Sequence, residues 1–314
     1  MAIDMSQLAA VLDGTSSVYV AIRTQSGPHL TPELFTVSGG RVLCLTSVVT
    51  LKARRARTEP IVAICAWHGD RALTALGDVE VIDPAVPTSV LAAPGTALQS
   101  PLGVARFLRD NAAEMTGAAI DLVAGRLGRP IPPHRVILAI KPVAATISEN
   151  GDVTMSDGWD LDPDPVDDGE PDAADEGDDD GEPDAADEGE AVDLRALPDG
   201  LATLAVAGPA AVGWMRPDGT PLALPAMWDP ARREALVPEA VFDLGAGVDR
   251  GPACVTFDAW SGYGPSGKQG VMLRGVGRAS RDDGSVRLAI DIDRASHWDG
   301  VETGTVDLDP TAPG

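Results

Sequence analysis

The sequence contains no apolar run long enough to cross a membrane, and its N-terminus has no basic segment followed by an apolar one. A membrane-spanning helix needs roughly 18 apolar residues, and a secretion signal needs the second pattern. We therefore expect a cytoplasmic protein with no membrane partner.

Cysteine and histidine are both scarce. The three cysteines each lie within an apolar segment, and an odd number without a secretion signal argues against a disulfide framework. The four histidines are scattered, with no spacing typical of a metal site. We expect the cysteines to fill the core and no bound metal. The cysteines are Cys44, Cys65 and Cys254.

Basic charge is scarce as well, and the acidic charge is concentrated in one place. The chain has 24 Lys and Arg against 48 Asp and Glu, and only three of its residues are lysines. Nineteen acidic residues lie between Asp157 and Asp193, so the other 29 leave the rest of the chain at a net charge of −5. Such a body has no basic field to attract phosphate backbones, which excludes nucleic acid as the main partner.

The acidic run is interpreted as a linker over residues 157–194. It contains no Lys or Arg, and the nonapeptide at 169–177 is repeated at 181–189. Proline, glycine and like charges at this density bury too little apolar surface to offset the entropy of ordering. The sequence therefore predicts a solvated tether between two folded domains.

The two domains read as copies of one unit. With an offset of 193, the copies align without a gap from Arg23 to Trp67, where Trp67 matches Trp260. The first domain is expected to span residues 1–156, with a helical insert at about 85–128, and the second residues 195–314. The second copy lacks the insert and has a longer loop at 261–269.

Short segments rich in Val, Ile and Leu, separated by glycine-containing turns, predict strands in both copies. In the first copy they cover 18–23, 30–37, 41–46, 61–67, 72–82 and 135–147, and in the second 211–215, 222–228, 234–238 and 253–260. A helix is expected from Leu51 to Arg57, ended by Pro60, and Ser6 is expected to cap a short helix that runs to Leu12. The fold class is therefore mainly β with helices (α+β), with each meander curled into a barrel.

An ordered series of motifs in the first copy resembles one known family. The series is His29-Leu30-Thr31-Pro32, the turn at Gly39-Gly40, Leu45-Thr46-Ser47, the basic helix at 50–55, and Glu59-Pro60 followed by Trp67. It resembles the FMN-binding split barrels of the pyridoxamine 5'-phosphate oxidase-like superfamily, some of which use the deazaflavin coenzyme F420. The resemblance implies split barrels that pair about a two-fold axis, with cofactors in the groove between them.

The resemblance also implies where a cofactor phosphate would be held. A strand-to-helix turn offers hydroxyls, unpaired helix amides and basic side chains to an anion. The candidate cofactor-binding residues of the first copy are Thr31, Pro32, Thr46, Ser47, Thr50, Lys52, Arg54 and Arg55. The alternative reading is a basic helix face exposed to solvent.

The matching segment of the second copy has lost its charge, because Gly245 replaces Lys52 and Gly247 replaces Arg54. We therefore expect a dimer fused into one chain, an intramolecular pseudo-dimer with one surviving site, which can act as a monomer. The second barrel would form a wall of that site. Candidates for this wall are Trp228, Tyr263 and Lys268.

The expected function is that of an oxidoreductase using FMN or F420 to transfer hydride to or from a small organic substrate. The cofactor would supply this chemistry, so no catalytic triad is expected, and catalytic residues stay unassigned. His29 is either an ordinary turn residue or a proton donor to a substrate. Two other functions stay open: a cofactor-free binding or scaffold protein, and a haem-handling split barrel with one histidine as ligand.

Overall fold

The computed structural model describes residues 3–83, 101–112, 116, 135–159, 197–198, 200–243, 249–260, 267–282, 284–300 and 302–308. In the first half, these residues form α1 (Met5–Leu12), β1 (Val18–Thr24), β2 (Gly27–Glu33), β3 (Phe35–Ser38), β4 (Arg41–Ser47), α2 (Leu51–Arg55), β5 (Ile61–His68), β6 (Arg71–Ile82), α4 (Pro101–Asp110), β7 (Arg135–Glu149) and β8 (Asp152–Asp157). In the second half, they form η3 (Leu201–Leu204), β9 (Gly208–Met215), β10 (Pro221–Asp229), β11 (Glu234–Pro238), α6 (Glu239–Phe242), β12 (Arg250–Trp260), β13 (Lys268–Asp282), β14 (Ser285–Asp299) and β15 (Glu302–Asp307).

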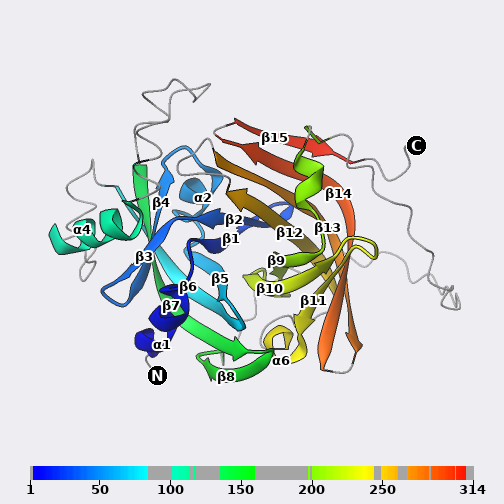
Figure 1. Ribbon diagram of the computed structural model, residues 1–314, viewed down its shortest axis with the longest axis horizontal. Helices are drawn as coiled ribbons and strands as arrows, with labels where there is room; N and C mark the ends of the chain where they lie inside the picture. The colour runs from blue at the N-terminus through cyan, green and yellow to red at the C-terminus, as the bar shows by residue number, and fades with distance from the viewer. Residues whose placement is uncertain are drawn as a thin grey trace, which may run out of the picture.

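Each half of the chain forms its own antiparallel sheet (Figure 1). The first sheet has the strand order β2-β1-β5-β6-β7-β4-β3, and its two ends, β2 and β3, are separated in sequence only by Leu34. The second has the order β11-β10-β9-β12-β13-β14-β15, and β11 also pairs with β14, so that sheet closes on itself. The two orders correspond strand by strand when β10 takes the place of both β2 and β3. Strand β15, which pairs with β14, corresponds to β8, which pairs with β7 in the first sheet. The predicted fold class of two tandem split barrels is confirmed.

A β-bulge occurs at the same place in both copies and explains a matched pair of glycines. The register shifts between Leu76 and Gly77 in the first sheet and between Arg274 and Gly275 in the second. A Cβ atom on Gly77 would lie 2.9 Å from the carbonyl oxygen of Lys141, and one on Gly275 would lie 1.6 Å from that of Asp291. Only glycine lets the neighbouring strand come this close at the bulge.

The two barrels share an apolar core where they meet. Strands β1 and β2 pack against β9, β10 and β12, in the centre of Figure 1. From the first barrel, Tyr19, Ala21 and Leu30 are buried in the same cluster as the core of the second barrel. Thr256 also donates a hydrogen bond of 2.8 Å to the Leu30 carbonyl. We call this junction the barrel seam, and the interior of the first barrel forms a separate cluster.

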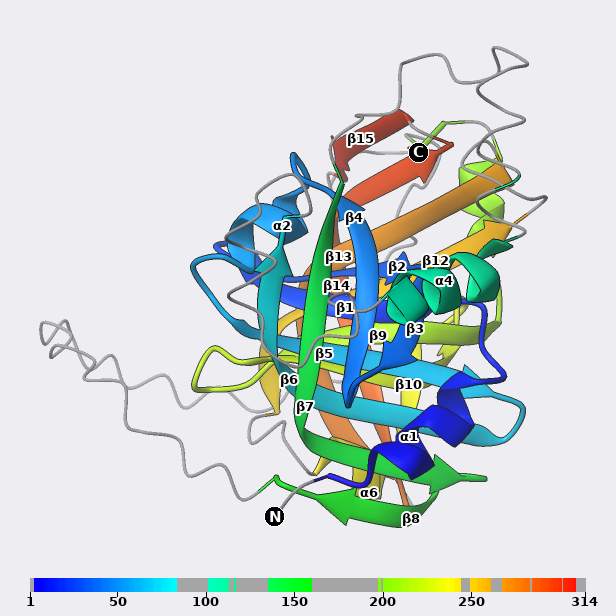
Figure 2. The ribbon, with the colours of Figure 1, turned by 90° about the vertical axis from the view of Figure 1, so that its left-hand side faces the viewer.

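Two helices, α1 and α4, lie on the side of the first barrel away from the seam. Figure 2 shows α1 and α4 in front of that barrel, with the second barrel behind. The Asp4 side chain caps α1 by accepting from the Ser6 amide at 2.9 Å, so the prediction that Ser6 is the cap was wrong. Aspartate accepts from its own helix start as readily as serine, and Ser6 already lies inside the first turn.

Several predicted features fall outside the described residues. Of the helical insert at 85–128, the structure describes α4 and its immediate continuation. Residues 160–196 and 261–266 are not described, so the linker over 157–194, the domain boundaries and the place of Tyr263 in the wall of the site stay predictions. In the described part of the chain, no helix is long and apolar enough to cross a membrane.

Candidate functional site

The turn from β4 into α2 is built by threonines. Thr50 caps α2, because its hydroxyl accepts a hydrogen bond of 3.3 Å from the Ala53 amide. The same hydroxyl lies 2.8 Å from the Ser47 carbonyl, to which it donates, and 3.3 Å from the hydroxyl of the buried Thr46. This arrangement fixes the turn and brings two of the candidate residues, Thr46 and Thr50, together.

Lys52, in the first turn of α2, is the most buried of the candidate basic residues, with only 5% of its surface exposed. Its ammonium donates to the Thr31 hydroxyl and forms an ion pair with the Glu33 carboxylate, both on β2. Burial lowers the pKa of Lys52, and the neighbouring carboxylate opposes this effect. The alternative of a solvent-exposed basic face therefore does not apply to Lys52.

A residue from the second barrel reaches the same strand. The Arg274 guanidinium on β13 contacts Nδ1 of His29 on β2, two residues before Thr31. Burial is the main cause that lowers the pKa of His29, to about 3, and the charges of Lys52 and Arg274 lower it further. His29 is thus neutral at pH 7, and because Nδ1 accepts from Arg274, we assign its proton to Nε2.

The duplication shows that this polar contact occurs on one side of the seam only. In the aligned copies, Leu222 takes the place of His29, and Leu76 takes the place of Arg274. Both leucines are buried in the shared apolar core. The positions that correspond to His29 and Arg274 on the other side of the pseudo-two-fold axis are therefore both apolar. The polar contact is made by His29, which belongs to the same copy as Lys52.

The remaining basic candidates of α2 differ in exposure. Arg54 is exposed, and Arg55 pairs with Glu59 at 3.2 Å. Ser47 is buried and lies opposite Arg135 in the β4–β7 ladder. Burial lowers the pKa of Arg135. Arg54 is thus the candidate cation of α2 that a solvent-borne anion reaches first.

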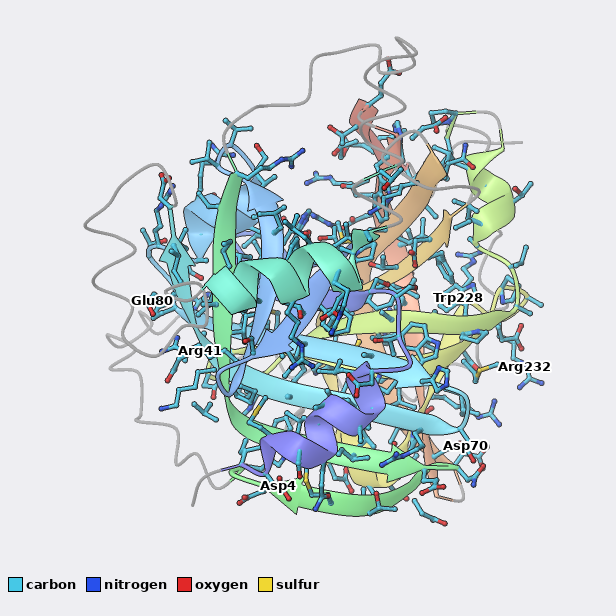
Figure 3. The ribbon with its side chains drawn as sticks, turned by 60° about the vertical axis from the view of Figure 1, so that its left-hand side comes forward. Asp4, Arg41, Asp70, Glu80, Trp228 and Arg232 are labelled. Carbon is cyan, nitrogen blue, oxygen red and sulfur yellow. The ribbon has the colours of Figure 1, made fainter. Side chains whose placement is uncertain are left out.

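The three other candidates lie at different places around the seam. Pro32 is opposite Tyr19 in the β1–β2 ladder. Trp228 on β10, labelled in Figure 3, is 4% exposed and packs edge-on against Phe257, with 5.6 Å between ring centroids. Lys268 begins β13, and its carbonyl accepts from the Gly300 amide at 2.8 Å. The structure thus places Trp228 in the core of the second barrel.

Sequence reasoning missed two residues of this cluster, Glu33 and Arg274. Glu33 directly follows the motif His29-Leu30-Thr31-Pro32, but nothing in its spacing reveals that it pairs with Lys52. Arg274 could have been found, because the offset of 198 that aligns Gly275 with Gly77 also aligns Arg274 with an apolar Leu76. A charged residue at a position that is apolar in the other copy is a signal of a site.

Metal chemistry has no geometric support in the described residues. No group of three or more His, Cys, Asp or Glu is arranged there to hold a metal ion. The three cysteines are buried and unpaired, and burial raises the pKa of Cys44 to about 12.

No protein family model and no curated protein matches the sequence. Solved structures do match it. A conserved hypothetical protein from Mycobacterium tuberculosis is 15% identical, with a TM-score of 0.33, covering 48% of this chain and 87% of that one. A pyridoxamine 5'-phosphate oxidase-related, FMN-binding protein from Nostoc punctiforme is 19% identical, with a TM-score of 0.31, covering 43% and 74%. A protein named F420 reductase is 20% identical, with a TM-score of 0.26, covering 43% and 93%.

Because these identities and TM-scores are low, the fold is assigned from the strand order described above and not from these matches.

Proposed function

We propose that this chain binds a flavin-type cofactor, FMN or F420, through an anionic group at the start of α2, and that it is an oxidoreductase acting on a small organic substrate. The observation that carries the proposal is the buried Lys52, held against Thr31 next to the His29–Arg274 contact. Glu33 neutralises Lys52, but Arg274 brings a second, half-buried cation to the same strand, and a bound anion would offset the cost of burying both charges.

Two buried polar atoms that lack hydrogen-bond partners in the described part of the chain indicate whether the residues fit a phosphate. Among the described residues, the Ser47 hydroxyl and Nε of Arg274 are buried without a hydrogen-bond partner. An unsatisfied buried donor costs about 1–3 kcal/mol, which an acceptor oxygen would recover. Ser47 leads into α2 and Arg274 contacts His29, so both unpartnered donors belong to the residues of the proposed site, and their chemistry fits an anion.

The residues then have distinct roles. Lys52 and the Ser47 hydroxyl would hold the phosphate, and Thr50 fixes the turn that presents them. Arg54 would attract the phosphate from solvent, and Glu33 keeps Lys52 in place and competes with the phosphate for its charge. Arg274 would make the site depend on the second barrel. A bound flavin or deazaflavin would supply hydride transfer, while the protein supplies binding and orientation.

The experiment is a calorimetric titration of the full chain with FMN and, separately, with F420. We expect one site per chain, and Lys52→Ala to weaken binding roughly ten- to a hundredfold, because it removes one charged hydrogen bond. Asp249→Asn is the matched control, since this exposed residue lies in the second copy and pairs with Arg281.

Two equivalent sites per chain, or unchanged affinity of the Lys52→Ala protein, would contradict the assignment. If neither cofactor binds, the cofactor-free scaffold is the better reading, and a Soret band in the purified protein would favour the haem-handling alternative.

A further inference from the structure

A pocket lies across the seam, between the β5–β6 hairpin of the first barrel and strands β10 and β11 of the second. Its volume is about 200 Å³. The first barrel contributes Trp67, Asp70 and Arg71, and the second contributes Met227 and Leu236, together with three prolines. We call it the hairpin pocket, and Figure 3 shows Asp70 at the tip of that hairpin.

The duplication relates the second-barrel side of this pocket to the part of the first barrel near Lys52, whose partners Thr31 and Glu33 flank Pro32. Pro225, which lines it, matches Pro32 of the first copy, and Leu236 matches Leu43. The basic residues of α2 have no counterpart here, because glycines replace Lys52 and Arg54 in the sequence. The hairpin pocket therefore lies at the seam like the Lys52 site, but the second copy has no basic residues in the place of Lys52 and Arg54 to bind a phosphate.

The lining combines apolar surface with one charge of each sign. Met227 is 53% exposed and Leu236 is 41% exposed, which is unusual for large apolar side chains on neighbouring strands. Arg71 and Asp70 are the charged residues of the lining, and Nε of Arg71 is buried with no hydrogen-bond partner among the described residues. An acceptor within the pocket would satisfy it.

We propose that the hairpin pocket binds a small zwitterion with an apolar side chain, the class to which apolar α-amino acids belong. Arg71 would bind the carboxylate, Asp70 the ammonium group, and Trp67, Met227 and Leu236 would cover the side chain. A cavity of about 150 Å³ is enough to bind benzene, so 200 Å³ accepts a branched or aromatic side chain but excludes a dinucleotide. This inference does not rest on the cofactor proposed above.

The test is a titration of the full chain with L-leucine and with two analogues that each lack one charge. 4-Methylpentanoate has no ammonium group, and 3-methylbutylamine has no carboxylate. Ligand-observed NMR measures all three affinities, and we expect each analogue to bind at least about tenfold more weakly than L-leucine, because each loses one charged hydrogen bond.

The variants assign each charge to its residue. Arg71→Gln should weaken L-leucine and 4-methylpentanoate roughly tenfold or more and leave 3-methylbutylamine unchanged, and Asp70→Asn should weaken L-leucine and the amine and leave 4-methylpentanoate unchanged. Arg232→Gln is the control, because this exposed arginine of the second barrel pairs with Asp229 and does not line the pocket.

Absence of saturable L-leucine binding would overturn the proposal, as would equal binding of L-leucine and either analogue. If Arg71→Gln fails to fold, the exposed Asp70 variant and the two analogues still decide the matter.

Discussion

The lowered pKa of His29 predicts that the protein loses stability in mild acid. Its pKa is lowered from the usual 6.5 to about 3, first by burial and then by the charges of Lys52 and Arg274. The folded protein therefore resists protonation of His29, while the unfolded chain takes up the proton below pH 6.5. The stabilisation is complete above pH 6.5 and is lost progressively as the pH falls towards 3.

The size of the effect follows from the pKa difference. Each pH unit in this window changes the free energy of unfolding by about 1.4 kcal/mol per proton. Between pH 7 and pH 5 the loss from His29 is therefore about 2 kcal/mol. That is a large part of the 5–15 kcal/mol typical of a folded domain.

The assay compares urea unfolding of the native protein and of the His29→Gln variant from pH 7.5 to pH 4.5. Glutamine still offers an acceptor to Arg274 but does not titrate, so the difference between the two free energies isolates His29 from the carboxylates and the other histidines. The native protein should lose about 2 kcal/mol more than the variant between pH 7 and pH 5. A difference that stays flat over this range would refute the reasoning, because it would mean that His29 is not buried beside these cations.

Three further results are expected. Leu30→Ala at the seam should lower the free energy of unfolding by about 2–5 kcal/mol, as should Leu138→Ala inside the first barrel, and both should keep one transition by calorimetry; two separated transitions would show that the barrels unfold independently. Thr50→Ala should cost about 0.5–2 kcal/mol in urea unfolding through loss of the α2 cap, and an unchanged midpoint would contradict that role. Deleting residues 160–190 should barely change the melting temperature, because the acidic sequence predicts a tether, and a large drop would show that it belongs to the fold.

The local elements and the duplication could be predicted from the sequence, because they depend on neighbouring residues. Short segments rich in Val, Ile and Leu between glycine-containing turns predicted most of the strands, and the offset of 193 predicted that the two sheets share one strand order. The helix after Thr50 followed from its cap and its good helix formers. The break at Leu34 was missed, because residues 30–37 were read as one strand although Pro32 and Glu33 interrupt its apolar residues.

The composition of the candidate site was only half predictable. Thr46, Thr50 and Lys52 are close in sequence, and their local structure brings them to one turn. The ion pair of Lys52 with Glu33 joins α2 to β2, with β3 and β4 between them in the chain, so no spacing along the chain reveals it.

The sequence by itself determined that this protein is two copies of one β unit, that one copy kept a basic turn, and that the acidic charge is gathered between them. Only the tertiary structure decided that Arg274 meets His29 and that the β5–β6 hairpin closes a pocket with β10 and β11. The reason is physical: strand patterns specify which side chains face inward or outward, whereas contacts between residues 245 positions apart depend on how the two barrels pack. That packing is decided by the complementary apolar surfaces that meet at Leu30 and Met272, which touch only once both barrels have formed.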